Sequence, residues 1–240
     1  MRKKFLERIL RNYIRIERVT LNSSMGLEAM ILADMHIHDF GRREAELEEI
    51  LKDSSEEADA IFILGDTYDE RTKSLEPIYR ILRQVNKPKF GVLGNHEHWA
   101  DPEIPISDGM RVLERAGVTL LVDRVTEYRG IRIGGIDWYE DDRSIRGKLL
   151  ELGKVDLLLS HTPDIIELNP NAKVVLAGHT HGGQVCFPLI GPVWTPSRYG
   201  RRYASGLFSK GESYLYVSRG LGEMTPIRIN CPRELTLIRI

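Results

Sequence analysis

The chain contains several short apolar runs, and each leads into a turn that carries histidine or aspartate. These runs are residues 28–33, 60–64, 89–93, 155–159 and 173–177. Runs of this length, bounded by glycine and polar residues, are typical of buried β-strands. Helical patterns separate the early runs, whereas strands follow one another more directly in the second half. This order predicts an α/β domain with a mixed sheet or two packed sheets.

The remaining elements follow from hydrophobic periodicity and turn residues. We expect helices at residues 42–52, 74–85 and 107–116, and further strands near 120, 125, 131–136, 214–217 and 235–240. No proline-rich or serine-rich linker divides the 240 residues, so we expect one domain over residues 1–240.

Residues 1–14 have the pattern of a basic amphipathic helix. The apolar stripe is formed by Phe5, Leu6, Ile9, Leu10 and Tyr13. The opposite face is rich in arginine and lysine, and this excess extends to residue 18. Such a helix either packs its stripe on the domain or lies on an anionic membrane, so peripheral membrane contact through residues 1–18 is one of two expectations.

Composition limits the classes of function. The formal net charge is −1, which gives no general electrostatic reason to bind nucleic acid, and no nucleic-acid partner is expected. The two cysteines, Cys186 and Cys231, fit reduced thiols better than a disulfide framework. No apolar run is long enough for a membrane span, and the N-terminus lacks a secretory signal pattern, so a cytoplasmic location is expected.

The turns after five predicted strands share one chemistry. Ligands of α/β sheets collect at the carboxyl ends of strands, so these turns are expected to converge on a single site. Six of the seven histidines lie in these turns, and the seventh, His98, follows one of them closely. The candidate residues are Asp34, His36, Asp66, Asp69, Asn95, His96, His161, His179 and His181.

Such a set suits two divalent cations held about 3.5–4 Å apart, which clamp an in-line displacement and activate a bridging water. The two cations repel each other, so a carboxylate must lie between them, and Asp66 is the candidate bridge. Imidazole, carboxylate and amide ligands together favour Mn, Fe or Zn over Mg or Ca.

Five motifs, taken in chain order, resemble those of the calcineurin-like metallophosphoesterases. They are Asp34-x-His36, Gly65-Asp66-x-x-Asp69, Gly94-Asn95-His96-Glu97, His161 and Gly178-His179-x-His181. The resemblance implies a four-layer αββα sandwich, two packed mixed β-sheets flanked by helices. It also implies a first metal on Asp34, His36, Asp66 and His181, and a second on Asp66, Asn95, His161 and His179. By the same resemblance, His96 would be a catalytic acid that binds no metal, and Asp69 would be the carboxylate that orients it.

The substrate class is narrowed by one departure from the protein phosphatases of this superfamily. Those enzymes carry arginine directly after the dyad aspartate, whereas this chain has Glu70 there.

Residues 182–184, 217–222 and 226–232 are similar to a branch related to membrane-associated phosphodiesterases and UDP-2,3-diacylglucosamine pyrophosphatases. We therefore expect a metal-dependent phosphoesterase that cleaves a phosphodiester or pyrophosphate bond, in a small-molecule, lipid-linked or nucleotide-containing substrate. A phosphomonoesterase, a nuclease and a non-catalytic binding scaffold of the same fold are the alternatives.

A long segment between His181 and the strand at 214 is rich in aromatic residues and arginines, including Trp194, Tyr199 and Arg201. Beside a dinuclear site these residues would accept an acyl chain or a nucleobase. The alternative is a loop that packs on itself and covers the sheet edge.

Overall fold

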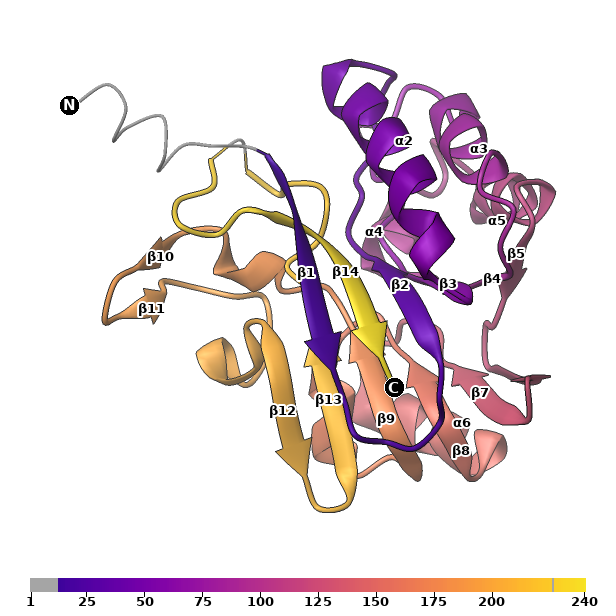
Figure 1. Cartoon of the computed structure of the whole chain (residues 1–240), viewed down its shortest axis with the longest axis vertical. Coiled ribbons are helices and arrows are strands. Elements are labelled where there is room, and N and C mark those ends of the chain that lie inside the picture. The colour runs from indigo at the N-terminus through magenta and orange to yellow at the C-terminus, as the bar shows by residue number, and fades with distance from the viewer. Residues whose placement is uncertain (1–12, 226) are drawn as a thin grey trace.

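The computed structural model describes residues 13–225 and 227–240 and contains two six-stranded sheets that pack face to face (Figure 1). The first sheet has the order β1 (Ile14–Thr20), β14 (Arg233–Arg239), β2 (Glu28–Leu32), β3 (Ala60–Leu64), β4 (Lys89–Val92) and β5 (Val118–Leu120). The second has the order β12 (Gly206–Lys210), β13 (Ser213–Val217), β9 (Ala172–Ala177), β8 (Val155–Leu159), β7 (Ile131–Gly135) and β6 (Arg124–Tyr128).

Both sheets are mixed, and their central strands run parallel. In the first sheet β2, β3, β4 and β5 are parallel neighbours, and β14 is antiparallel to β2. In the second sheet β7, β8, β9 and β13 are parallel, and the edge strands β6 and β12 are antiparallel to their neighbours. The carboxyl ends of parallel strands lie at one edge of a sheet, so each sheet offers one edge at which a site is built.

Helices cover the outer faces of the sheets. The first sheet packs against α2 (Arg42–Ser54), α3 (Glu76–Arg83) and α5 (Ile106–Arg115), and the second against α6 (Asp142–Leu152). Figure 1 shows α2, α3 and α5 side by side over the outer face of β2 to β4. A short helix, α4 (Asn95–Trp99), follows β4, and a two-stranded hairpin, β10 (Cys186–Phe187) and β11 (Gly191–Pro192), projects from the body.

Three apolar cores separate these layers, and alternate residues of one strand enter different cores. In β2, Met30 and Leu32 face the helices, while Ala29 and Ile31 face the other sheet. Because both faces of the central strands are covered, their side chains are apolar without interruption, as the sequence runs predicted. The predicted four-layer αββα fold is confirmed.

The structure also contains elements that the sequence did not predict. Helix α6 was missed, although Asp141 caps it by accepting a hydrogen bond from the Ser144 N–H at 2.9 Å. The predicted helix at residues 1–14 lies outside the described residues up to residue 12, and Ile14 begins β1. Among the described residues, no helix has both the length and the apolar character needed to cross a membrane.

Candidate metal centre

The carboxyl ends of five strands, three from the first sheet and two from the second, meet at one place. Hydrogen bonds join their loops: the Asp34 N–H donates to the Gly65 carbonyl at 3.1 Å, and the Gly178 N–H donates to the His161 carbonyl at 2.9 Å. The His179 N–H donates across the sheets to the Asp34 carboxylate, at 2.9 Å. The predicted ligands that follow these strands are Asp34, His36, Asp66, Asn95, His161, His179 and His181.

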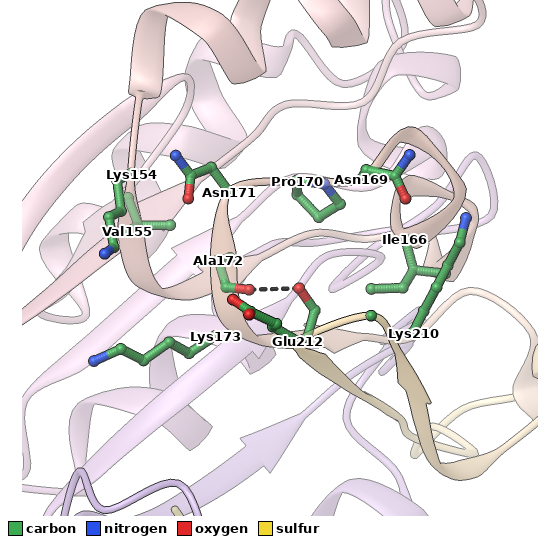
Figure 2. A pocket seen from close by; sticks show the side chains of 12 residues that line it. Lys154, Val155, Ile166, Asn169, Pro170, Asn171, Ala172, Lys173, Lys210 and Glu212 are labelled. Carbon is green, nitrogen blue, oxygen red and sulfur yellow. Dashed lines mark hydrogen bonds between the residues drawn. The ribbon is translucent and has the colours of Figure 1, made fainter.

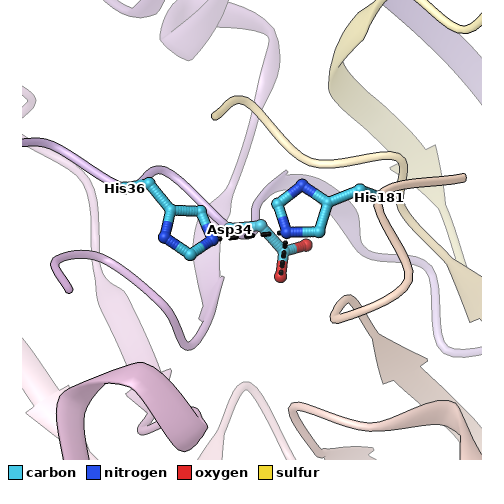
Figure 3. A group of neighbouring side chains, drawn as sticks. All are labelled: Asp34, His36 and His181. Atoms are coloured by element: carbon cyan, nitrogen blue, oxygen red, sulfur yellow. Dashed lines mark hydrogen bonds and ion pairs between the residues drawn. The ribbon is translucent and has the colours of Figure 1, made fainter. Parts of the chain in front are cut away.

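Asp34, His36 and His181 form the first group of converging donor atoms (Figure 3). Their ligand atoms lie within 4.8 Å of one another, and the Nε2 atoms of the two histidines are 3.3 Å apart. The His181 Nε2 lies 3.9 Å from Asp34 Oδ1. All three side chains are buried and aim at one point, which is the arrangement that a cation needs.

Asp66, His161 and His179 form the second group. The His161 Nε2 is central: it lies 3.1 Å from Asp66 Oδ2, 3.0 Å from Asn95 Oδ1 and 3.0 Å from His179 Nδ1. Two imidazole nitrogens, an amide oxygen and a carboxylate oxygen thus face a common centre. This donor set matches the ligands that Mn, Fe and Zn accept.

Asp66 lies between the two groups. Its Oδ2 is 3.1 Å from the His161 Nε2 in the second group and 3.8 Å from the His36 Nε2 in the first. A carboxylate that reaches both groups offsets the repulsion between two cations, so the residues present fit a dinuclear centre.

Burial and charge set the protonation of the first group. Burial, opposed by the neighbouring His161, raises the pKa of Asp34 to about 6. Burial, together with His36 and the Arg228 guanidinium, lowers the pKa of His181 well below its usual range. His181 is therefore a neutral imidazole with a lone pair, the form in which histidine binds a metal.

The second group contains one strongly coupled pair. Burial opposes charge on both partners, but the attraction between them raises the pKa of His161 to about 9 and holds the pKa of Asp66 well below its usual range. Burial and the adjacent His161 lower the pKa of His179 to about 3. Without a cation, the carboxylate of Asp66 is thus balanced by a proton on His161.

The backbone of the site is strained. Five predicted ligands have φ in the left-handed region, namely Asp34 (49°), His36 (43°), Asp66 (52°), His179 (70°) and His181 (50°). Each such residue costs about 1–2 kcal/mol relative to ordinary backbone. Strain of this kind persists where the surrounding structure fixes it, and it is characteristic of functional sites.

Glu97 fixes two of these loops, and sequence reasoning gave it no role. Its Oε2 accepts hydrogen bonds from the N–H groups of Asp66 and Gly94, both at 2.8 Å. Its Oε1 accepts from the Thr67 N–H at 2.5 Å and the Thr67 hydroxyl at 2.7 Å. One fully buried carboxylate therefore ties the loop after β3 to the loop after β4.

The structure corrects the predicted pair of Asp69 and His96. The Asp69 Oδ2 lies 3.0 Å from the His36 Nδ1 and 2.8 Å from the His38 Nε2, and it orients a predicted ligand instead. Glu70 takes the expected place, with Oε2 2.8 Å from the His96 Nδ1. Because the Asp69 Oδ1 also accepts the Arg71 N–H at 2.8 Å, its carboxylate is held on the His36 side of the turn.

Arg228 is a second buried residue whose role the sequence did not reveal. It donates to the carbonyls of His181 at 3.2 Å, Arg219 at 2.8 Å and Gly222 at 2.7 Å. The loop that it holds packs behind Asp34, whose carbonyl accepts the Gly222 N–H at 2.6 Å. A buried guanidinium thus supports ligands from both sheets.

A cavity of about 440 Å³ lies at the other end of the second sheet (Figure 2). It is lined by residues before β8 and β9 and by the turn from β12 to β13, so it faces the amino ends of those strands. Its Lys173 and Lys210 are paired with Asp156 at 2.8 Å and Glu167 at 2.5 Å. Because this cavity lies at the opposite end of the strands from the candidate ligands, it is not part of the metal centre.

A smaller apolar pocket of about 270 Å³ adjoins the metal centre. Thr180, the residue between His179 and His181, forms part of its wall. Val185, Val193, Trp194 and Met224 are among the residues that line it. Trp194 of the aromatic segment after His181 therefore lies beside the site, while Tyr199 packs against Tyr203 within the segment.

Comparison with known proteins agrees with this geometry. Residues 28–183, more than half of the chain, match the family described as "Calcineurin-like phosphoesterase". The uncharacterized metallophosphoesterase YkuE of Bacillus subtilis is 28% identical over 233 residues, which is 90% of this chain and 79% of the relative. The phosphodiesterase YaeI of Escherichia coli is 30% identical over 162 residues, 64% of this chain and 58% of the relative.

Solved structures share the fold at low sequence identity. A dimetal phosphatase from Danio rerio superposes with a TM-score of 0.55 at 13% identity, covering 84% of this chain and 90% of that one. TT1561 of Thermus thermophilus gives a TM-score of 0.53 at 16% identity, covering 82% and 91%. The family match and the two groups of converging, largely buried side chains lead to one conclusion: the chain belongs to the calcineurin-like phosphoesterase family and is a metal-dependent phosphoester hydrolase.

Proposed function

We propose that the chain hydrolyses a phosphodiester or pyrophosphate bond with two divalent cations. The first would be held by Asp34, His36, Asp66 and His181, and the second by Asp66, Asn95, His161 and His179. When bound, such a pair supplies an activated water and neutralises the charge that develops on the phosphoryl oxygens. The observation that carries this proposal is the sharing of Asp66 between two groups of donors.

His96 is the residue best placed to act on the substrate itself. Its side chain is 20% exposed, whereas those of His36, His161 and His181 are 1% exposed, so it borders the open side of the site. Glu70 accepts a hydrogen bond at the His96 Nδ1, which leaves the Nε2 to face a phosphoryl oxygen or leaving group. We infer that Glu70 fixes the ring while His96 donates a hydrogen bond or a proton.

Glu70 also favours a diester over a monoester. It places a carboxylate, 44% exposed, at the rim of the site. A monoester carries up to two negative charges near neutral pH and a diester carries one, so this carboxylate repels the monoester more strongly. The protein named phosphodiesterase among the relatives supports the same choice.

The apolar pocket beside Thr180 supports a substrate with an apolar or aromatic portion. A pocket walled by Val193, Trp194 and Met224 gains free energy from burying an acyl chain or a nucleobase, and very little from a small polar alcohol. A lipid-linked or nucleotide-containing phosphoester is therefore the substrate class that we propose.

Hydrolysis of bis-p-nitrophenyl phosphate and p-nitrophenyl phosphate tests the reaction. The purified protein would be assayed after loading with Mn, Fe or Zn, with metal content measured on the same samples. We expect the diester to be the better substrate. Preference for the monoester would refute the diester choice, and inactivity on both with two metals bound would refute the proposed activity.

The variant His96→Ala separates two roles for this residue. Its ligand atom lies within 4.8 Å of those of His36 and Asp66, a distance that also suits a metal ligand. As an acid or hydrogen-bond donor, His96 would be needed for kcat but not for metal content, and we expect a loss of about 10²–10⁴ in kcat. Loss of one metal equivalent in the variant would make it a ligand instead.

A further inference from the structure

Exposed apolar side chains gather on the hairpin of β10 and β11 and on the chain beside it. Leu189 is fully exposed at 109%, Ile190 is 64% exposed and Trp194 is 60% exposed. Phe187, Val193 and Ile227 add to the same surface, each about half exposed or more. We call residues 186–194 the apolar hairpin.

The apolar hairpin is tied to the body mainly at its base, and at its tip by a hydrogen bond from Arg201 to the Ile190 carbonyl. At the base, the Asn230 side chain donates to the Cys186 carbonyl at 3.0 Å, and Val185 forms a bridge with Ile229. The two strands contain only two residues each, and the hairpin projects from the sheets (Figure 1). Its tip is therefore a protrusion, which suits insertion into a soft surface better than docking in a rigid groove.

The side chains of the apolar hairpin are layered in the order that a lipid surface requires. Leu189 and Ile190 lie at the turn, where hydrocarbon would surround them. Trp194 lies at the base, and tryptophan prefers the boundary between hydrocarbon and water. The Arg201 guanidinium is anchored beside the hairpin by donating to the carbonyls of Ile190 and Pro192, both at 3.3 Å, where its charge can pair with a lipid phosphate.

The sequence that precedes β1 is rich in basic residues. Ile14, the first residue of β1, pairs with Arg233, two residues after Cys231, whose thiol donates to the Gly182 carbonyl at 3.5 Å. Residues 1–12, which precede β1, contain five basic residues and one acid in sequence. These charges favour an anionic surface over a neutral one.

We propose that the apolar hairpin inserts its Leu189–Ile190 tip into the surface of an anionic lipid membrane. This contact differs from the one expected for residues 1–18, because its apolar contribution comes from a folded hairpin at the rim of the metal centre. Val193 and Trp194 belong both to the hairpin and to the pocket beside Thr180. A membrane bound at the tip therefore lies next to the pocket and the candidate metal ligands.

Vesicle co-sedimentation of the full chain tests the proposal. The vesicles would be phosphatidylcholine alone and an equal mixture of phosphatidylcholine and phosphatidylglycerol. The variant Leu189→Asp/Ile190→Asp is compared with wild type and with Leu150→Asp, which changes a leucine that is 83% exposed on α6. Each variant is also assayed for turnover of soluble bis-p-nitrophenyl phosphate. Because the tip lies outside the metal centre, unchanged turnover shows that the variant is folded.

We expect wild type and Leu150→Asp to bind the anionic vesicles equally, and the tip variant to bind at least about tenfold more weakly, since two aliphatic side chains leave the hydrocarbon. Equal binding by all three proteins would overturn the proposal and assign membrane contact to other residues. Absence of wild-type binding would also overturn it. If wild type then forms a dimer that the tip variant does not form, the surface joins two copies of the chain.

Discussion

Replacing Glu97 by glutamine is the most direct test of how the site is held together. The glutamine has the same shape, but it keeps one acceptor oxygen and turns an NH₂ group toward the donors on the other side. The favoured orientation turns the NH₂ group toward Thr67, whose hydroxyl can rotate to accept from it. The hydrogen bond from the Thr67 N–H is then lost, and those from Asp66 and Gly94 become bonds to a neutral oxygen. Hydrogen bonds to a charged group are worth about 1.5–3 kcal/mol each and neutral ones about 0.5–1.5 kcal/mol, so losing one bond and weakening the others costs about 3–6 kcal/mol before any offset.

Part of this loss is offset, because burial raises the pKa of Glu97 and a neutral amide is less costly to bury than a carboxylate. We therefore expect the free energy of unfolding to fall by about 3 kcal/mol, a large share of the roughly 5–15 kcal/mol of a typical domain. The loops after β3 and β4 carry Asp66 and Asn95, so metal content should fall as well.

Urea unfolding in the presence of a chelator measures the first effect, and metal analysis after gel filtration measures the second. Glu44→Gln is the matched control, because Glu44 is also a buried carboxylate at the third position of a helix and accepts the Gly41 N–H at 3.1 Å. Glu44 lies in α2 and pairs with Arg43, which donates to the His36 carbonyl at 2.6 Å. Glu44→Gln should cost about 1 kcal/mol and lower the metal content less than Glu97→Gln does. If Glu97→Gln lost no more stability than Glu44→Gln and bound the same metal, the role given to Glu97 would be refuted.

Three further predictions concern single positions. Asp66→Asn should lower the metal content to one equivalent or less per chain, because the shared carboxylate is gone; retention of two by elemental analysis would count against a bridge. Gly94→Ala should abolish activity and lower the urea midpoint of unfolding, since the new Cβ would lie 2.2 Å from Asp66 Oδ1. An unchanged midpoint would show that the loop can move to accommodate the methyl group. His98 pairs with Asp137 at 2.9 Å, and this hydrogen bond raises the pKa of His98 above its ordinary 6.5. The pair thus stabilises the fold below about pH 6.5, and this contribution is lost as pH rises through the raised pKa. His98→Gln should cost about 1 kcal/mol at pH near 5.5 and less near 8.5 by urea unfolding; a constant difference would contradict this sign.

The positions of the strands, and the convergence of the His- and Asp-containing turns on one site, were predictable from the pattern of apolar and polar residues. Apolar runs such as residues 60–64 and 173–177 have both faces covered, so their composition alone identifies them as buried strands. Because parallel strands bring their carboxyl ends together, the turns that follow could be placed at one site before any distance was known. His181 groups with Asp34 and His179 with Asp66, and the service of two cations by this one turn stays a prediction.

Side-chain direction within a turn could not be predicted in the same way. Asp69 and Glu70 are consecutive carboxylates, and which of them reaches His96 depends on backbone contacts such as the Arg71 N–H on Asp69. The role of Glu97 is likewise hidden, because its four partners belong to loops 30 residues apart. Helix α6 was missed because its apolar residues are few and Gly147 interrupts its pattern.

Neither candidate cation position is complete on one sheet. Asp34 and His36 come from the first sheet and need His181 from the second, and Asp66 and Asn95 need His161 and His179 from the second. A bound cation would therefore hold the two sheets together. Its binding free energy would add to the free energy with which one sheet packs on the other. Metal binding then reports that the segment from His161 to His181 has docked on the first sheet, and chelation should loosen the packing between the sheets as well as stop turnover.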